Sequence, residues 1–373
     1  MRKSILFGML VVVAAPAVAQ QRWHPEIGVQ GGYARVKPAG TGQNDHIDLF
    51  EFPSPGYLVP LLSYGPLFAT IPWNDRIAVE PTLGLAQIQI GGTDLTTVRL
   101  GVRGNYAFTN HLYAGLGGVL NYFSSGNSQM QLGAQVGVGY RFGLAPQLGG
   151  RVEASWISTR PNPNIGATNS YALLFGLSAR LDGSPSNRPV PRLADRAWQP
   201  MLGLTGGYAN AHIVGGGSIA GIILPGFGGS LPAITGGSTP LPQPPTVFAI
   251  IPIGRRLALE PGLDIHRFQS SGQTVFSGNV GARLDFAVHA GWYAAVGGQL
   301  TYIKATQGTF TDPNRSSASV TGATLAWGYR FRIARQVGGR TELNYSMYGK
   351  NSNIPSPPVN VTSILFGLTM PLK

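Results

Sequence analysis

Apolar and polar residues alternate along most of this chain with the two-residue period of a β-strand. Between 99 and 108, Leu100, Val102 and Tyr106 share one face, whereas Arg99 and Arg103 share the other. Gly, Pro and Asn interrupt this alternation at short intervals, which predicts an all-β protein. The predicted strands cover 25–36, 66–73, 76–90, 95–108, 111–123, 129–142, 148–158 and 170–181, then 200–211, 246–253, 256–269, 275–288, 291–303, 318–331, 337–348 and 361–372.

The two sets of strands are copies of each other. The segment Tyr-Arg-Phe at 140–142 returns at 329–331, and Gly-Gly-Arg at 149–151 returns at 338–340. Trp23 and its copy Trp198 stand near the start of each half. The sequence therefore predicts a signal peptide at 1–19, a first barrel repeat at 22–182, a Pro-rich periplasmic linker at 183–196 and a second repeat at 197–373.

The distance between matching residues grows along the chain. It is 175 positions near the start of each half, 180 in the middle, 189 later and 191 at the end. Each increase falls in a connection that follows an odd-numbered strand, so all length changes lie at one end of an up-and-down barrel. Short turns at one end and variable loops at the other are typical of outer-membrane barrels. The longest variable loops are predicted at 37–65 and 212–245.

Composition narrows the class of protein. Glycine makes up 53 of 373 residues, charged residues only 11%, and cysteine is absent, which excludes disulfides and thiolate metal sites. Residues 2–19 have the charged start, apolar centre and Ala-Val-Ala end of a secretory signal. After it, no stretch of 18 apolar residues suggests a transmembrane helix. The exported chain is therefore predicted to be soluble in the periplasm, to be secreted, or to cross the outer membrane as strands.

Alternation alone does not say which face of the barrel points outward. The scarcity of charges, the many glycines on the polar face and the aromatic residues near strand ends favour lipid outside and polar residues inside. The fold class is therefore predicted to be a transmembrane antiparallel up-and-down β-barrel. Two tandem eight-stranded barrels are favoured, because the linker is long for a turn; one sixteen-stranded barrel is the alternative.

Ten charged residues fall on the predicted interior face, five in each half. Charges in such an enclosure must be paired, so they are predicted either to plug a narrow barrel or to form a charged gate that selects solutes. They are Glu80, Arg103, Arg141, Arg151, Glu153, Glu260, Arg283, Arg330, Arg340 and Glu342.

Other chemistry receives little support. The six histidines have no histidine at their repeat partners, no metal-ligand spacing is present, and the glycine pairs lack the lysine and helix of a phosphate loop. No catalytic residue, cofactor or metal is therefore predicted. Removal of Arg2 and Lys3 with the signal lowers the formal charge from +12 to +10. In an exported protein this excess favours anionic lipid headgroups and lipopolysaccharide over nucleic acid as partners; the alternative is that it reflects only arginine inside the barrel and a basic linker.

The signal peptide, strand count, alternation and loop asymmetry resemble the small eight-stranded outer-membrane β-barrel family, which includes the OmpA transmembrane domain and the OmpX- and OmpW-like barrels. The resemblance covers both halves and implies assembly by the barrel-insertion machinery. The chain departs from the family at its end, Gly-Leu-Thr-Met-Pro-Leu-Lys, which lacks a terminal aromatic residue.

Three function classes remain at this point. The favoured one is a non-enzymatic membrane protein that acts through its external loops, with interiors plugged by Arg/Glu pairs. The second is a porin or small-solute channel. The third is a lipid-modifying or proteolytic barrel enzyme.

Overall fold

The computed structural model describes residues 23–38, 46–52, 67–90, 93–125, 127–145, 148–161, 166–181, 198–213, 218–224, 245, 247–270, 273–305, 317–334, 337–349 and 358–372. In the first repeat the strands are β1 (Glu26–Pro38), β2 (Ile47–Phe52), β3 (Leu67–Pro72), β4 (Ile77–Ile90), β5 (Thr93–Ala107), β6 (Leu112–Ser125), β7 (Asn127–Ala145), β8 (Leu148–Thr159) and β9 (Thr168–Arg180). In the second they are β10 (Met201–Ile213), β11 (Ser218–Leu224), β12 (Val247–Pro252), β13 (Leu257–Ser270), β14 (Gln273–His289), β15 (Trp292–Ala305), β16 (Ser317–Ala334), β17 (Val337–Tyr348) and β18 (Val359–Pro371).

Across the described part of the chain, no helix has the length and apolar character needed to cross a membrane.

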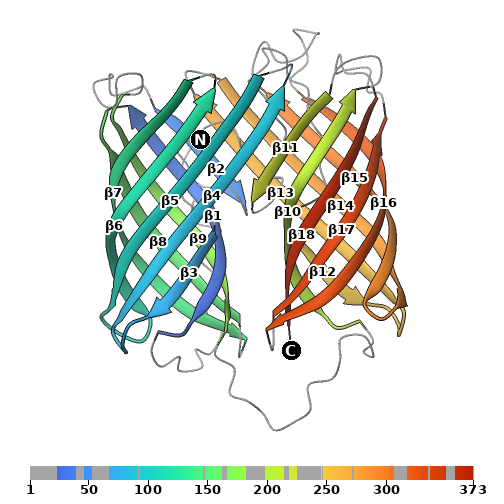
Figure 1. Cartoon of the computed structure of the whole chain (residues 1–373), viewed down its shortest axis with the longest axis horizontal. Helices are drawn as coiled ribbons and strands as arrows, with labels where there is room; N and C mark the ends of the chain where they lie inside the picture. The colour runs from blue at the N-terminus through green and yellow to red at the C-terminus, as the bar shows by residue number, and fades with distance from the viewer. Residues whose placement is uncertain are drawn as a thin grey trace, which may run out of the picture.

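Each repeat closes an eight-stranded antiparallel ring at one end of the molecule. Residues Glu26–Val29 of β1 pair with β3, β3 pairs with β4, and β5 to β9 lead back to β1. The second repeat repeats this ring with β10, β12 and β13 to β18. We call these rings leg one and leg two. They lie at the end where β9 finishes and β10 begins, named here the linker end (Figure 1). The predicted all-β barrel class is confirmed.

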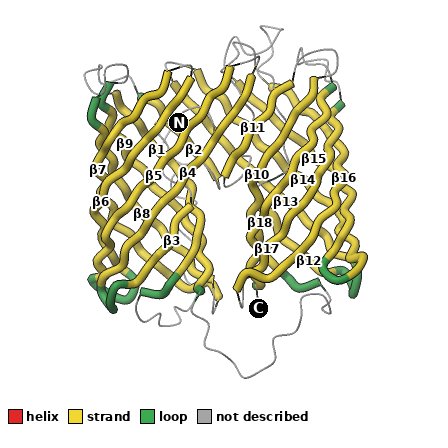
Figure 2. Tube along the Cα trace, viewed as in Figure 1, coloured by secondary structure: helices red, strands yellow, loops and turns green. Residues whose placement is uncertain are grey.

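At the opposite, outer end the same strands change partners. Residues Gly32–Val36 of β1 pair with β2, whose other edge pairs with Ile265–Ser270 of β13 in the second repeat. In the same way, β10 pairs with β11, which pairs with Leu85–Ile90 of β4. The two rings therefore open into one another, and the outer wall is a single ring of sixteen strands (Figures 1 and 2).

One sequence-based expectation needs correction. Each repeat has nine strands instead of eight, because the predicted loops at 37–65 and 212–245 contain β2 and β11. The favoured architecture of two eight-stranded barrels is confirmed by the two legs, and the ring of sixteen strands occurs in the same molecule at its outer end. The exact repeat and linker boundaries stay predictions.

The outer face of the strands is apolar, as predicted. Residues such as Val102, Leu116 and Leu325 are more than half exposed, whereas their neighbours Arg103 and Thr324 are buried. On β15 the outward Trp292 and Tyr302 mark the two ends of the apolar stretch. Ten residues at about 3.3 Å each, tilted by about 40°, span about 25 Å, the height of the apolar band of outer-membrane barrels. This belt supports the predicted location in the outer membrane.

Gly32 and Gly207 mark the point where β1 and β10 change partners. Both have a φ of 155°, and a Cβ on either would lie 2.1 Å from a neighbouring backbone oxygen, that of Leu173 or Ile364. Any side chain would therefore push apart two strands that run the full height of the wall.

Substitution at these glycines tests the strand exchange. Gly32→Ala and Gly207→Ala are expected to lower the free energy of unfolding by about 2 kcal/mol or more, because the backbone must move to admit the methyl group. Urea unfolding followed by heat-modified migration in gels measures this. Gly104→Ala is the matched control, since a Cβ there meets nothing within 4 Å. Equal stability of Gly32→Ala and Gly104→Ala would contradict the assigned geometry.

Cleavage of the linker tests whether the exchange holds the repeats together. A protease site placed at 183–196 is expected to yield two polypeptides that stay together in mild detergent, because β2–β13 and β11–β4 pairing crosses between repeats. Size-exclusion chromatography of the cut protein measures this. Separation into two independently folded halves would show that the legs are autonomous barrels.

Candidate functional site: the closure of each leg

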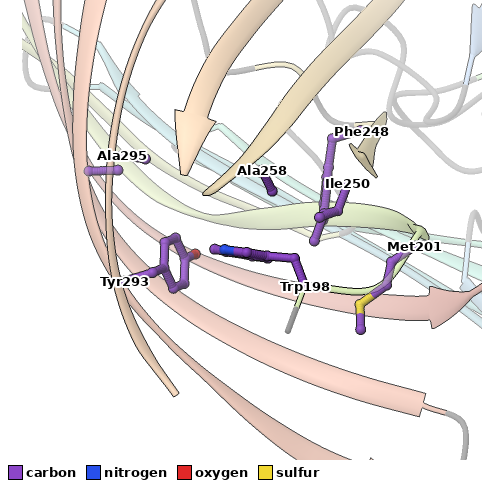
Figure 3. Close-up of a cluster of buried hydrophobic side chains, with 8 residues drawn as sticks. Trp198, Met201, Phe248, Ile250, Ala258, Tyr293 and Ala295 are labelled. Carbon is purple, nitrogen blue, oxygen red and sulfur yellow. The ribbon is translucent and has the colours of Figure 1, made fainter. Parts of the chain in front are cut away.

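A tryptophan that precedes the first strand of each repeat closes the leg at the linker end. Trp23 is 5% exposed, donates its indole N–H to the backbone oxygen of Arg76 at 3.0 Å, and packs edge-on against Tyr113. Trp198 packs edge-on against Tyr293 in leg two and belongs to a buried cluster (Figure 3). The members of that cluster are Trp198, Met201, Phe248, Ile250, Ala258, Tyr293, Ala295 and Ala326.

A cation stacks on each of these tryptophans. The guanidinium of Arg141 lies 3.8 Å from the Trp23 ring centre, and that of Arg330 lies 3.5 Å from the Trp198 ring centre. Such contacts are attractive because the ring face is electron-rich. Arg141 and Arg330 therefore stabilise the tryptophan layer and stand apart from the main ion pairs above it.

Leg one holds a compact charge network above its tryptophan. Arg103 donates two hydrogen bonds to Glu153, both of 2.5 Å, and also lies 2.7 Å from Glu80. Arg151 donates to Glu80 at 2.6 Å and to the side-chain oxygen of Gln30. All four charged groups are at most 5% exposed. The network therefore joins β1, β4, β5 and β8 across the lumen.

Leg two repeats the network with one added carboxylate. Arg283 binds both oxygens of Glu342 at 2.7 and 2.6 Å and contacts Glu260 at 3.0 Å, while Arg340 donates to Glu260 at 2.5 Å. Asp285 lies 3.0 Å from Arg283, at the position that Asn105 holds in leg one. The structure thus places all ten sequence-predicted residues in the leg interiors and brings eight of them into two networks.

The added carboxylate offsets a loss elsewhere. Glu26, which lies 4.0 Å from Arg141, corresponds to Met201 in the second repeat, so leg two lacks that charge. With Glu26 or Asp285 included, the tryptophan layer and the network together hold three arginines and three carboxylates in each leg. Beyond these layers, Arg99 is also buried in the first repeat and Asp264 in the second. Buried charges cost several kcal/mol unless paired, which explains why one carboxylate replaces the other.

Tyrosine completes each network and was not among the predicted site residues. Tyr113 donates to Glu153 at 2.7 Å, and Tyr293 donates to Glu342 at 2.7 Å. Both are at most 1% exposed. The two tyrosines match at an offset of 180 in the repeat, which is a signal in the sequence. The sequence does not show that their hydroxyl groups reach β8 and β17, each two strands away in its ring.

Glycines opposite the large side chains make room for these layers. A Cβ on Gly139 would lie 2.4 Å from the Tyr113 ring, and a Cβ on Gly176 would lie 2.8 Å from the Arg151 side chain. The copies Gly328 and Gly367 stand in the same relation to Tyr293 and Arg340. An eight-stranded ring is just wide enough to be filled by side chains, so each large residue needs a small one facing it.

Pro245 adds a layer on the outer side of the network in leg two. Its backbone oxygen accepts a hydrogen bond of 3.3 Å from Thr205, and its ring fills the space beside Gly262 and Gly281. A cavity of about 30 Å³ lies between this proline and the network. That volume holds about two water molecules.

No protein-family model matches this chain, and no curated protein matches it. Among solved structures it is similar to the CymD monoaromatic hydrocarbon channel, with a TM-score of 0.29 and 8% identity over 94% of this chain and 88% of that one. It is similar to the Vibrio cholerae outer membrane protein OmpT lacking loop L8, with a TM-score of 0.24 and 10% identity over 92% and 97%.

A third similar structure is the NanC porin, with a TM-score of 0.22 and 11% identity over 78% of this chain and 99% of that one. These likenesses are too weak to assign a family or a function. The narrower resemblance to OmpA, OmpX- and OmpW-like barrels stays a prediction.

Loss of one network arginine tests the energetic role of the charges. Arg103→Met leaves Glu153 buried without its cation, so the free energy of unfolding should fall by about 3 kcal/mol or more. Adding Glu153→Gln should restore part of that loss, because the unpaired charge is removed. Urea titration of both variants measures the difference.

The control for this test is Arg76→Gln, which alters an exposed guanidinium and should change stability by less than about 1 kcal/mol. If Arg103→Met unfolds at the urea concentration of the unmodified protein, the network does not hold leg one together.

Proposed function

We propose that this chain is a non-enzymatic outer-membrane protein that is closed at its linker end and acts at its outer end. The observation that carries the proposal is the double closure of each leg, by a buried tryptophan and by the Arg–Glu–Tyr network beyond it. A conducting porin of this size keeps an aqueous lumen through its whole height. Here the wide sixteen-stranded wall narrows into two legs whose described interiors are filled with side chains.

The outer end offers charged groups for a surface role. On the sheet formed by β1, β2 and β13, Arg35, Lys37 and Arg267 lie on the outward face, and Asp48 binds Arg35 at 2.7 Å. The net positive charge of this face favours anionic headgroups, of which lipopolysaccharide is the one proposed from the sequence. The proposed surface role therefore includes β2 and β11, which lie within the predicted loops at 37–65 and 212–245, as well as the loops themselves.

A gated channel is the competing function. The same networks could close two pores that open when Arg103 and Arg283 change partners, which is why the decisive measurement is electrical. Among the described residues, no cluster of three metal-binding side chains occurs.

Planar-bilayer recording tests the proposal. The unmodified protein is expected to show no steady conductance, because both legs are filled. Trp23→Ala combined with Arg103→Ala should open leg one and give steps of conductance, whereas Arg267→Ala at the outer surface should not. Steady openings of the unmodified protein would show that it is a channel.

A further inference from the structure

The walls that face each other between the legs are set by the strand exchange. At the linker end, β3 lies between β1 and β4 and closes leg one. At the outer end, β4 pairs with β11 of the second repeat instead. β12 has the same position in leg two. The linker-end parts of β1, β3 and β4 therefore face those of β10, β12 and β13 (Figure 1).

Every described residue on the outward face of β3 and β12 is apolar. Leu67, Ala69 and Ile71 point outward from β3, and Val247, Ala249 and Ile251 point outward from β12. Their paired neighbours on β1 and β10 are apolar too, namely Ile27 and Leu202. Contact of water with these apolar side chains is unfavourable, so the space favours an apolar occupant.

Exposure shows that the legs do not pack on each other near the linker end. Ile71 and Ile251 are 55% and 48% exposed, whereas the outward-facing Val29 and Leu204, at the height of the strand exchange, are 5% and 7% exposed. The space between the legs is thus open at the linker end and closed at mid-height. Its walls continue the lipid-facing belt of the barrel.

The height of this space fits one leaflet. β3 has six residues, and six residues at about 3.3 Å each, tilted by about 40°, climb about 15 Å. One leaflet contributes about half of a hydrocarbon core of about 30 Å. An acyl chain that enters from the linker side would therefore extend to the closed end of the space at mid-height. The polar headgroup of the lipid would stay outside the hydrocarbon core.

The mouth of the space carries cations. The turn after β3 places Arg76 at the surface, and the turn after β12 places Arg255 and Arg256 there; all three are exposed. Asp75 is the one acidic residue in these two turns. Trp73, 79% exposed, adds an aromatic side chain of the type found at headgroup level.

We propose that the space between the legs binds an anionic phospholipid of the linker-side leaflet. Its acyl chains lie between the apolar walls, and its phosphate lies at Arg76, Arg255 and Arg256. The inference rests on the fold and the apolar belt and is independent of whether the legs conduct. Lipid then contacts each leg on all its outward faces, and the bilayer is continuous between the two legs.

Spin labels locate the filling of the space. The chain has no cysteine, so Ala69→Cys and Ala249→Cys can each carry one nitroxide in phosphatidylglycerol vesicles. Collisions with dissolved oxygen should exceed those with a water-soluble nickel complex, as at the lipid-facing control Gly104→Cys. The turn control Gly254→Cys should show the reverse. Greater nickel access at Ala69→Cys, or complete disulfide formation in the Ala69→Cys/Ala249→Cys double variant, would overturn the proposal.

Lipid retention tests the headgroup site. Protein reconstituted in equal parts phosphatidylglycerol and phosphatidylcholine, then purified in detergent, should retain phosphatidylglycerol over phosphatidylcholine by about threefold in native mass spectrometry, an excess that corresponds to less than 1.4 kcal/mol. Arg255→Gln with Arg256→Gln should remove this preference, and Arg160→Gln, which alters an exposed guanidinium just after β8 at the outer end, should keep it. Equal retention of both lipids by the unmodified protein would overturn the anionic selectivity.

Discussion

The structure depends on one constraint, that backbone N–H and C=O groups facing hydrocarbon must find partners inside the protein. A strand edge left open in the membrane is not tolerated, so each ring has to close. This chain closes its rings differently at two heights. Where β1 and β4 pair with β3, leg one is complete; where they pair with β2 and β11, the wall continues into the second repeat. Each repeat has two short strands, β2 and β3 or β11 and β12, where an eight-stranded barrel has one. One of them closes the leg and the other joins the two repeats.

The small diameter of an eight-stranded ring determines which side chains can fill its interior. A ring of this size leaves room for side chains alone, and the polar side chains inside must satisfy one another. Arg103 meets this need with three carboxylate contacts from two glutamates, and Tyr113 adds a donor from a further strand. Between the repeats, Met201 stands in place of Glu26 and Asp285 in place of Asn105, so one carboxylate of the leg interior has a different position in each leg.

The change of strand partners produces both the closed legs and the space between them. Because the rings separate only over the length of β3 and β12, the outer end remains one wide wall and the linker end becomes two filled legs. The filling of the legs is the basis of the role at the outer surface that we propose. The separation also creates two apolar walls that face each other within the bilayer, with cations at their open edge.

The sequence by itself determined the strands, their faces and the repeat, because alternation and spacing are local properties of the chain. It also placed all ten charged residues inside, since parity along a strand decides the face. Their partners were not predictable: Arg141 and Arg330 stack on tryptophans, and Tyr113 reaches Glu153 forty residues away. β2 and β11 were missed because they are six and seven residues long, lie in segments rich in Pro and Gly, and pair with strands of the other repeat. Only the tertiary structure decided that the molecule has two eight-stranded rings at one end and one sixteen-stranded ring at the other, because ring closure is set by contacts between residues far apart in the chain.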